Sequence, residues 1–193
     1  MDNKKLQQIK YYAAHGWPIL PVAWLNDDKC ICGKPGCKSP GKHPLLDNGF
    51  YGASVENVEI TGWHQRWPDS NWGLRTGAAD QGGAGILVVD IDIRNDGFTT
   101  WDILREEHPE QIETVTVATG GGGQHLWFKM PNIDIRSIEG ALGKGIDVKA
   151  NGGYVLVPPS KTTNPYKFNI NPDDCEISEL PGWILDKLTG NGR

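Results

Sequence analysis

The sequence predicts a single domain of the α+β class. Segments with apolar residues at helical spacing are interspersed with short apolar or alternating runs that end at glycine and proline clusters. The first pattern is typical of amphipathic helices and the second of β-strands. Because 193 residues suffice for one large domain or for one core with a small appendage, we expect one unit over residues 1–193, in which residues 26–50 form an insertion.

The first half of the chain begins with a predicted helix. Leu6, Ile9 and Ala13 recur at helical spacing, which predicts a helix over Lys4–His15 that ends before Gly16. Residues 26–50 are rich in Gly, Pro, Cys and Lys and have no periodicity, so we expect a segment ordered by a metal ion and not by regular structure. The other elements expected in this half are a strand, a helix and a strand, at Ile19–Trp24, Val55–Trp67 and Trp72–Thr76.

The clearest strand of the sequence is predicted over Gly85–Ile93. Its Ile-Leu-Val-Val run is apolar on both faces, as in a central strand that is covered on both sides, and acidic residues appear only at its end. The remaining expected elements are a helix at Thr99–Glu107, strands at Thr114–Thr119, Leu126–Met130, Ile146–Lys149, Tyr154–Val157 and Tyr166–Phe168, and a closing helix at Pro181–Leu188.

The composition excludes several classes of protein. Hydrophobic residues make up 38% and charged residues 22% of the chain, which is usual for a globular protein and not for a disordered or fibrous one. No apolar run approaches the length of a membrane span, and the N-terminus is too polar for a signal peptide, so we expect a cytoplasmic protein without a membrane partner. A net charge of −5 counts against tight nonspecific binding to nucleic acid, although basic patches and bound cations can offset it.

Asp90 and Asp92 are the first candidate catalytic residues. Residues two apart in a strand point to the same face, with Cα atoms roughly 6.6 Å apart. Two carboxylates so placed can bind the hard cations of two-metal phosphoryl transfer, and the alternative is a solvated strand end. Asp147 supplies a third carboxylate, and Lys149 shares its strand face and suits a triphosphate. For that pair, the alternative is a surface ion pair.

A glycine-rich turn, Gly120–Gly123, precedes His125. Consecutive glycines can expose backbone N–H groups to an anion, so Gly122 and Gly123 are candidate nucleotide-binding residues, and His125 can donate to a phosphate oxygen. The alternative is a flexible hairpin with an incidental histidine.

Four potential metal ligands lie within residues 30–43. They follow the pattern Cys30-x-Cys32-x4-Cys37-x5-His43, which can close a tetrahedral zinc site. In a reducing compartment such a cluster favours a metal over disulfides. The alternative for the end of this segment is that Lys42 directs the turn towards a nucleotide.

The order of these motifs resembles that of the N-terminal domain of bifunctional DNA primase-polymerases from plasmids, phages and other mobile elements, in the archaeo-eukaryotic primase superfamily. The likeness spans nearly the whole chain, although no single motif is decisive. The segments that carry it are Tyr12–Pro18, Cys37–Pro44, Asn71–Gly73, Val89–Asp92, the glycine turn with His125, Gly145–Lys149, Tyr154–Ser160 and Leu180–Trp183.

The resemblance implies an RRM-like catalytic core. It implies that Asp90, Asp92 and Asp147 bind Mg²⁺ or Mn²⁺, that His125 contacts the phosphates of the incoming nucleotide, and that Ser160 and Lys161 lie near that nucleotide. The cysteine cluster is similar to a zinc element of some members. The implied partners are a single-stranded DNA template, an NTP or dNTP, and a helicase module in the same or another chain.

Two other functions fit the same residues. Three acids and a histidine also suit a metal-dependent nuclease or phosphohydrolase. A noncatalytic zinc-containing module that binds single-stranded nucleic acid is the alternative from another class, but it leaves the three acids without a role.

Overall fold

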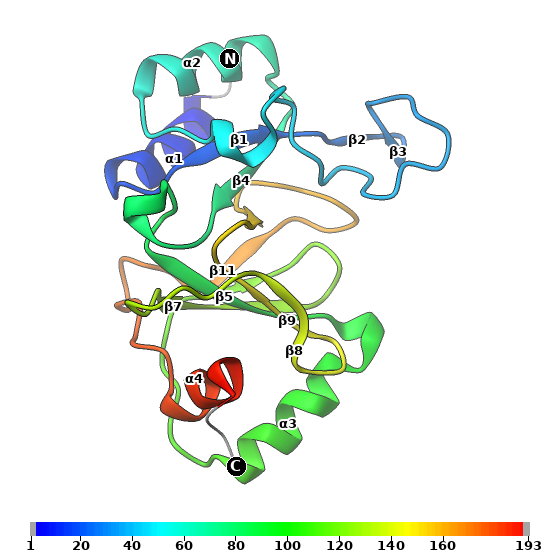
Figure 1. Cartoon of the computed structure of the whole chain (residues 1–193). Helices are drawn as coiled ribbons and strands as arrows, with labels where there is room; N and C mark the ends of the chain where they lie inside the picture. Colours follow the sequence, from blue (N-terminus) through cyan, green and yellow to red (C-terminus); the bar gives the residue numbers. More distant parts are fainter. Residues whose placement is uncertain (1–2, 191–193) are drawn as a thin grey trace.

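The computed structural model describes residues 3–190, so residues 1–2 and 191–193 of the expected unit lie outside the described part. Two β-sheets lie between two pairs of helices, which confirms a mixed α+β fold (Figure 1). One pair packs beyond the smaller sheet and the other beyond the larger sheet. The pairs are α1 (Asn3–Ala14) with α2 (Asn57–Arg66), and α3 (Gly97–Glu107) with α4 (Gly182–Thr189).

The larger sheet has six strands in the order β11-β6-β7-β5-β9-β8, and all adjacent strands in it are antiparallel. In chain order these strands are β5 (Ile86–Ile91), β6 (Thr116–Ala118), β7 (Gln124–Lys129), β8 (Ile138–Gly143), β9 (Ile146–Lys149) and β11 (Lys167–Ile170). The smaller antiparallel sheet has the order β1-β4-β10, formed by Ile19–Val22, Asn71–Arg75 and Tyr154–Val157.

Strand β5 separates two hydrophobic cores. Leu87, Val89 and Ile91 pack with α3 and α4, while Ile86 and Val88 pack with the smaller sheet, α1 and α2. This confirms the prediction of a central strand that is covered on both faces. Because strand side chains alternate, Asp90 continues the face of Ile86 and Val88 and therefore points between the two sheets.

Helices α1 and α2 pack against the smaller sheet. Ile9 and Tyr12 on α1 and Ile60 on α2 are fully buried against the smaller sheet. The Tyr12 hydroxyl donates to the Pro158 carbonyl at 2.6 Å, which satisfies its buried polar group. Helix α1 ends at Ala14, two residues before Gly16, whose φ of +72° is the left-handed conformation that glycine adopts without strain.

The elements differ from the sequence prediction most clearly in three places. Strand β8 was not expected, because its sequence IEGALG contains two glycines and its register is interrupted between Ile138 and Gly143. The segment expected to be irregular contains a short hairpin, β2 (Leu25–Asn26) and β3 (Lys29–Cys30), and a 3-10 turn, η1 (Gly49–Gly52). Strand β5 ends at Ile91 and not at Ile93, because another 3-10 turn, η3 (Ile93–Asn95), follows Asp92.

Among the described residues, no helix combines the length and apolar character that crossing a membrane requires.

Candidate active site

Asp90 lies between His125 and Asp147 in a row across the larger sheet. In the antiparallel register, Asp90 of β5 is opposite His125 of β7 on one side and Asp147 of β9 on the other. Directly opposite residues of adjacent strands point to the same face. Three separate stretches of sequence therefore bring their polar side chains to one place.

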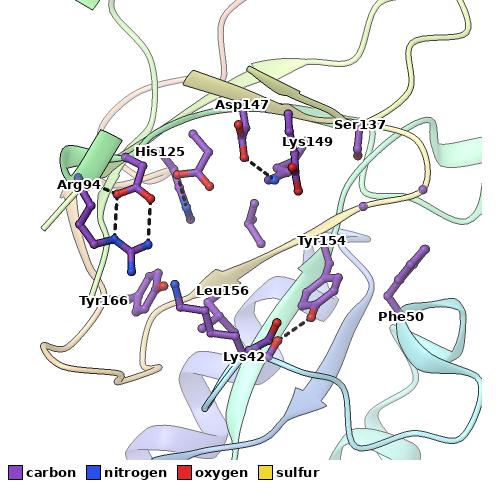
Figure 2. A pocket seen from close by; sticks show the side chains of 17 residues that line it. Lys42, Phe50, Arg94, His125, Ser137, Asp147, Lys149, Tyr154, Leu156 and Tyr166 are labelled. Carbon is purple, nitrogen blue, oxygen red and sulfur yellow. Dashed lines mark hydrogen bonds and ion pairs between the residues drawn. The ribbon is translucent and has the colours of Figure 1, made fainter. Parts of the chain in front are cut away.

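The row faces a cavity of about 480 Å³. Asp92 and Lys149 line it beside the row, and Lys42 and Tyr154 line it from the opposite wall, where β10 and the segment before η1 approach (Figure 2). The cavity exists because polar residues replace apolar ones where β5 and β9 extend beyond the packed core between the sheets. The structure thus brings together all three predicted acids and three of the predicted nucleotide-binding residues, which are Lys42, His125 and Lys149.

Asp92 caps the turn that follows β5 and is paired with Arg94. Its Oδ1 accepts the backbone N–H of Arg94 at 2.9 Å, and the Arg94 guanidinium donates to both carboxylate oxygens at 3.1 and 2.8 Å. The Arg94 hydrogen bonds hold the pKa of Asp92 below its usual value of 3.8, although partial burial opposes them. The carboxylate is therefore ionised at neutral pH.

Asp147 is held from two sides. Lys149 Nζ lies 2.9 Å from Oδ2, as the shared strand face predicts, and the Gly140 backbone N–H donates to Oδ1 at 2.8 Å. The sequence left two interpretations of Asp147 and Lys149, a surface ion pair or a site for a cation and a triphosphate. The two are compatible, because the ion pair forms inside the cavity.

His125 is almost fully buried at the base of the cavity. Its Nε2 lies 3.5 Å from Asp90 Oδ1, and its Nδ1 has no hydrogen-bond partner within residues 3–190. Burial lowers its pKa from 6.5; Asp90 opposes this shift, and Lys42 and Lys149 add to it. His125 is consequently neutral at pH 7, with one N–H to donate.

The buried state of His125 predicts a pH dependence of stability. The unfolded chain binds the proton near pH 6.5, whereas the native state binds it only at lower pH. The free energy of unfolding should therefore fall as the pH is lowered from 7 to 5, by at most about 1.4 kcal/mol per pH unit from this group. Urea denaturation at several pH values should show a shallower fall for His125→Gln. An equally steep fall in this variant would contradict the prediction.

Two predicted nucleotide-binding glycines do not line the cavity. The N–H of Gly122 donates to the Thr119 carbonyl and that of Gly123 to Thr119 Oγ1, both at 3.0 Å, so these groups close the turn. Gly122 has φ of +88°, and a Cβ on Gly123 would come within 2.2 Å of the Ile91 carbonyl oxygen. The turn therefore requires glycine at position 122 for its backbone conformation and at position 123 for its contact with β5. This turn positions His125.

Ser160 and Lys161 also lie outside the cavity. The buried Ser160 hydroxyl accepts from the Trp72 N–H at 2.8 Å and donates to the Trp72 carbonyl at 3.0 Å, so it joins the chain to β4. Lys161 lines a separate cavity with Asn71, whose side chain bonds both the N–H and the carbonyl of Lys161. The resemblance implied that these residues lie near the nucleotide, but the sequence could not reveal that the Ser160 hydroxyl and the backbone groups of Lys161 are bonded to β4.

Cys30, Cys32, Cys37 and His43 converge as their spacing predicts. Their ligand atoms lie within 4.8 Å of one another, and Cys30 Sγ is 3.2 Å from His43 Nε2. Neighbouring ligand atoms around tetrahedral zinc are about 3.8 Å apart, so three sulfurs and one nitrogen fit this ion. Hydrogen bonds from the Gly41 N–H, Cys32 and His43 outweigh the effect of burial and lower the pKa of Cys30 to about 6, which favours the ligating thiolate.

The same loop directs Lys42 into the active-site cavity. The Gly41 N–H donates to Cys30 Sγ at 3.4 Å, and its carbonyl accepts from Asn71 at 2.9 Å. The Lys42 carbonyl accepts from the Tyr154 hydroxyl at 2.5 Å. His43 in the cluster and Lys42 in the cavity are therefore compatible, because adjacent residues serve the two sites.

Oxygen donors such as the three aspartates suit hard divalent cations. Among the described residues 3–190, the ligand atoms of the cysteine-histidine cluster lie within 4.8 Å of one another, whereas the three aspartates do not form such a group. The carboxylates of Asp92 and Asp147 each face a basic side chain. The aspartates thus fit Mg²⁺ or Mn²⁺ by chemistry and by their common cavity, and a bound cation has to compete with these basic partners.

Other cavity residues were not identified from the sequence. Arg94 stands two residues after Asp92, and its charge beside the acidic pair was the available signal. Tyr154 lies in a predicted strand without any sign of which face would be polar. Phe50 and Glu139 come from segments without periodicity, so nothing in the sequence pointed to them.

Comparison with known proteins identifies the family of the chain. The family model for the N-terminal domain of bifunctional DNA primase/polymerase (Prim-Pol) matches residues 9–183 of the 193-residue chain. A search of curated proteins finds no match. The family points to a nucleotidyltransferase-type enzyme with DNA and nucleotides as substrates. The match includes both sheets, the acidic row and the cysteine-histidine cluster, and the chain therefore belongs to the bifunctional DNA primase/polymerase family.

Proposed function

We propose that the chain is a DNA primase-polymerase that transfers nucleotides on a single-stranded DNA template with two divalent cations, Mg²⁺ or Mn²⁺. Asp90, Asp92 and Asp147 would hold the cations. The observation that carries the proposal is the strand register that sets Asp90 between His125 and Asp147, on the wall of a cavity that also contains basic side chains.

The charge of the cavity supports a triphosphate substrate. Four carboxylates and three basic side chains line it, so its net charge is −1 with His125 neutral. Two divalent cations would raise this to about +3, which complements the roughly four negative charges of a nucleoside triphosphate. The residues counted are Asp90, Asp92, Glu139, Asp147, Lys42, Arg94 and Lys149.

The two ends of the cavity differ, which supports one orientation of the nucleotide. Arg94, Lys42 and Tyr166 lie at one end, and Phe50 and Tyr154 at the other (Figure 2). The rings of Phe50 and Tyr154 are stacked, with centroids 5.9 Å apart. Bases stack readily on aromatic rings and phosphates pair with cations, so we place the base towards Phe50 and the phosphates towards Arg94.

The reaction would be attack by a primer 3′-hydroxyl, or by the hydroxyl of a first nucleotide, on the α-phosphorus. A new P–O bond forms and pyrophosphate leaves. The cations would lower the pKa of the attacking hydroxyl and neutralise the leaving group. Lys42 and Lys149 would pair with the phosphates, and neutral His125 would donate its N–H to a phosphate oxygen. Catalysis would rest on positioning and electrostatics.

Three wider assignments belong to the same proposal. The larger sheet with α3 and α4 would be the RRM-like catalytic core. The enzyme would act in the replication of a mobile element or phage, together with a helicase module in the same or another chain. These assignments rest on the order of the sequence motifs.

Incubation with labelled single-stranded DNA, primed and unprimed, tests the function. With nucleotides and Mn²⁺ or Mg²⁺, we expect extension of the primer or new products on the unprimed template. Shortening of the DNA without nucleotides would favour a nuclease. Binding of the DNA that survives loss of the three acids, without any turnover, would favour a noncatalytic module.

A further inference from the structure

Arg94 occupies both oxygens of the Asp92 carboxylate. Its Nε donates to Oδ1 at 3.1 Å and its Nη2 to Oδ2 at 2.8 Å, and its backbone N–H adds a third bond to Oδ1 at 2.9 Å. A cation that binds Asp92 has to replace at least part of this bidentate contact, because each oxygen already faces a positively charged donor.

The Arg94 guanidinium is exposed, so its contact with Asp92 can be exchanged for another partner at little cost. The Arg94 side chain is 67% exposed, and exposed ion pairs contribute little to stability. Arg94 also lines the cavity, at the end where Lys42 and Tyr166 lie (Figure 2). A rotation of its side chain would keep the guanidinium within the space assigned to the phosphates.

We propose that Arg94 changes partner during nucleotide binding: it pairs with Asp92 before a divalent cation binds, and it pairs with the triphosphate once the cation takes that carboxylate. The inference rests on the proposed function and adds a residue that positions the substrate. The planar guanidinium suits this exchange, because its paired N–H groups match carboxylate and phosphate oxygens equally well. Before and after the exchange, the guanidinium and the Asp92 carboxylate each face an opposite charge.

Arg94→Ala should change two affinities in opposite directions. Without nucleotide, Mn²⁺ should bind about threefold to fivefold more tightly, because a competing cation is lost. At saturating Mn²⁺, a fluorescent non-hydrolysable dNTP analogue should bind about tenfold more weakly, because a bidentate phosphate contact is lost. Free Mn²⁺ can be followed by electron paramagnetic resonance and the nucleotide by fluorescence anisotropy.

Two variants serve as comparisons. Arg94→Lys keeps the charge but not the paired donors, so it should bind the nucleotide more weakly than the wild type and more tightly than Arg94→Ala. Arg136→Ala is the matched control, because Arg136 pairs with Asp134 at the same sequence spacing, 3.8 Å apart and outside the cavity. Both affinities should stay as in the wild type for this control.

Two results would overturn the inference: unchanged affinities in Arg94→Ala, or a loss of both affinities to the same extent. The second would mean that Arg94 holds Asp92 in place for the cation. A wild-type protein that binds Mn²⁺ and the nucleotide without incorporating it would contradict the proposed function and leave the exchange intact. The two failures can therefore be told apart.

Discussion

Asp90→Asn is expected to lower nucleotide incorporation by about 10³-fold or more and to leave the fold intact. Asp90 is at the centre of the acidic row, and its neighbour His125 is a neutral imidazole at pH 7. The substitution keeps the size of the side chain and removes the charge that a cation needs. Because Asp90 faces Asp147 across the strands, removing one of two like charges should not destabilise the sheet.

Three measurements test this prediction. Incorporation of labelled nucleotide on a primed template gives the rate, thermal denaturation gives the stability, and Mn²⁺ titration gives the cation affinity, which should also fall. Asp92→Asn should behave in the same way. Asp102→Asn is the matched control, because Asp102 is exposed on α3 and does not line the cavity. Full activity in Asp90→Asn with unchanged Mn²⁺ affinity would exclude the two-metal assignment.

Cys37→Ser is expected to weaken nucleotide binding about tenfold, although Cys37 does not line the cavity. The cysteine-histidine cluster is bonded to the loop that carries Lys42: the Gly41 N–H donates to Cys30 Sγ, and the next residue after Lys42 is His43, a candidate zinc ligand. Loss of a zinc ligand should release this loop, and Lys42 would then lose its position in the cavity. Substitution is preferable to chelation, since a chelator would also remove Mn²⁺.

A double-mutant cycle separates this effect from a general loss of structure. Lys42→Ala alone should also weaken binding of the fluorescent nucleotide about tenfold. If the cluster acts through Lys42, the double variant should be no weaker than either single variant. Cys175→Ser is the control, because Cys175 lies outside the cluster. Metal analysis and thermal denaturation of each variant should show zinc loss with a folded core, whereas a hundredfold loss in the double variant would mean that the two residues act independently.

Local sequence patterns were sufficient to predict most of the helices and strands and to single out Asp90, Asp92 and Asp147, which line one cavity. The Ile-Leu-Val-Val run predicted a central strand, and alternation placed Asp147 and Lys149 on one face. Strand β8 was missed because glycines interrupt its pattern. Ser160 was assigned to the nucleotide by resemblance and the turn glycines by their exposed N–H groups, but the Ser160 hydroxyl bonds to Trp72 and the glycine N–H groups bond to Thr119 within the turn.

The sequence by itself determined which side chains share a strand face, because alternation is a property of the backbone within each strand. It also determined the convergence of the cysteine-histidine cluster, whose ligands are close along the chain. Only the tertiary structure decided that Asp90 faces His125 and Asp147, because shifting a strand by two residues keeps every side chain on its face and changes all its neighbours. The approach of Lys42 to the acidic row depends likewise on how the two sheets pack, which no local pattern encodes.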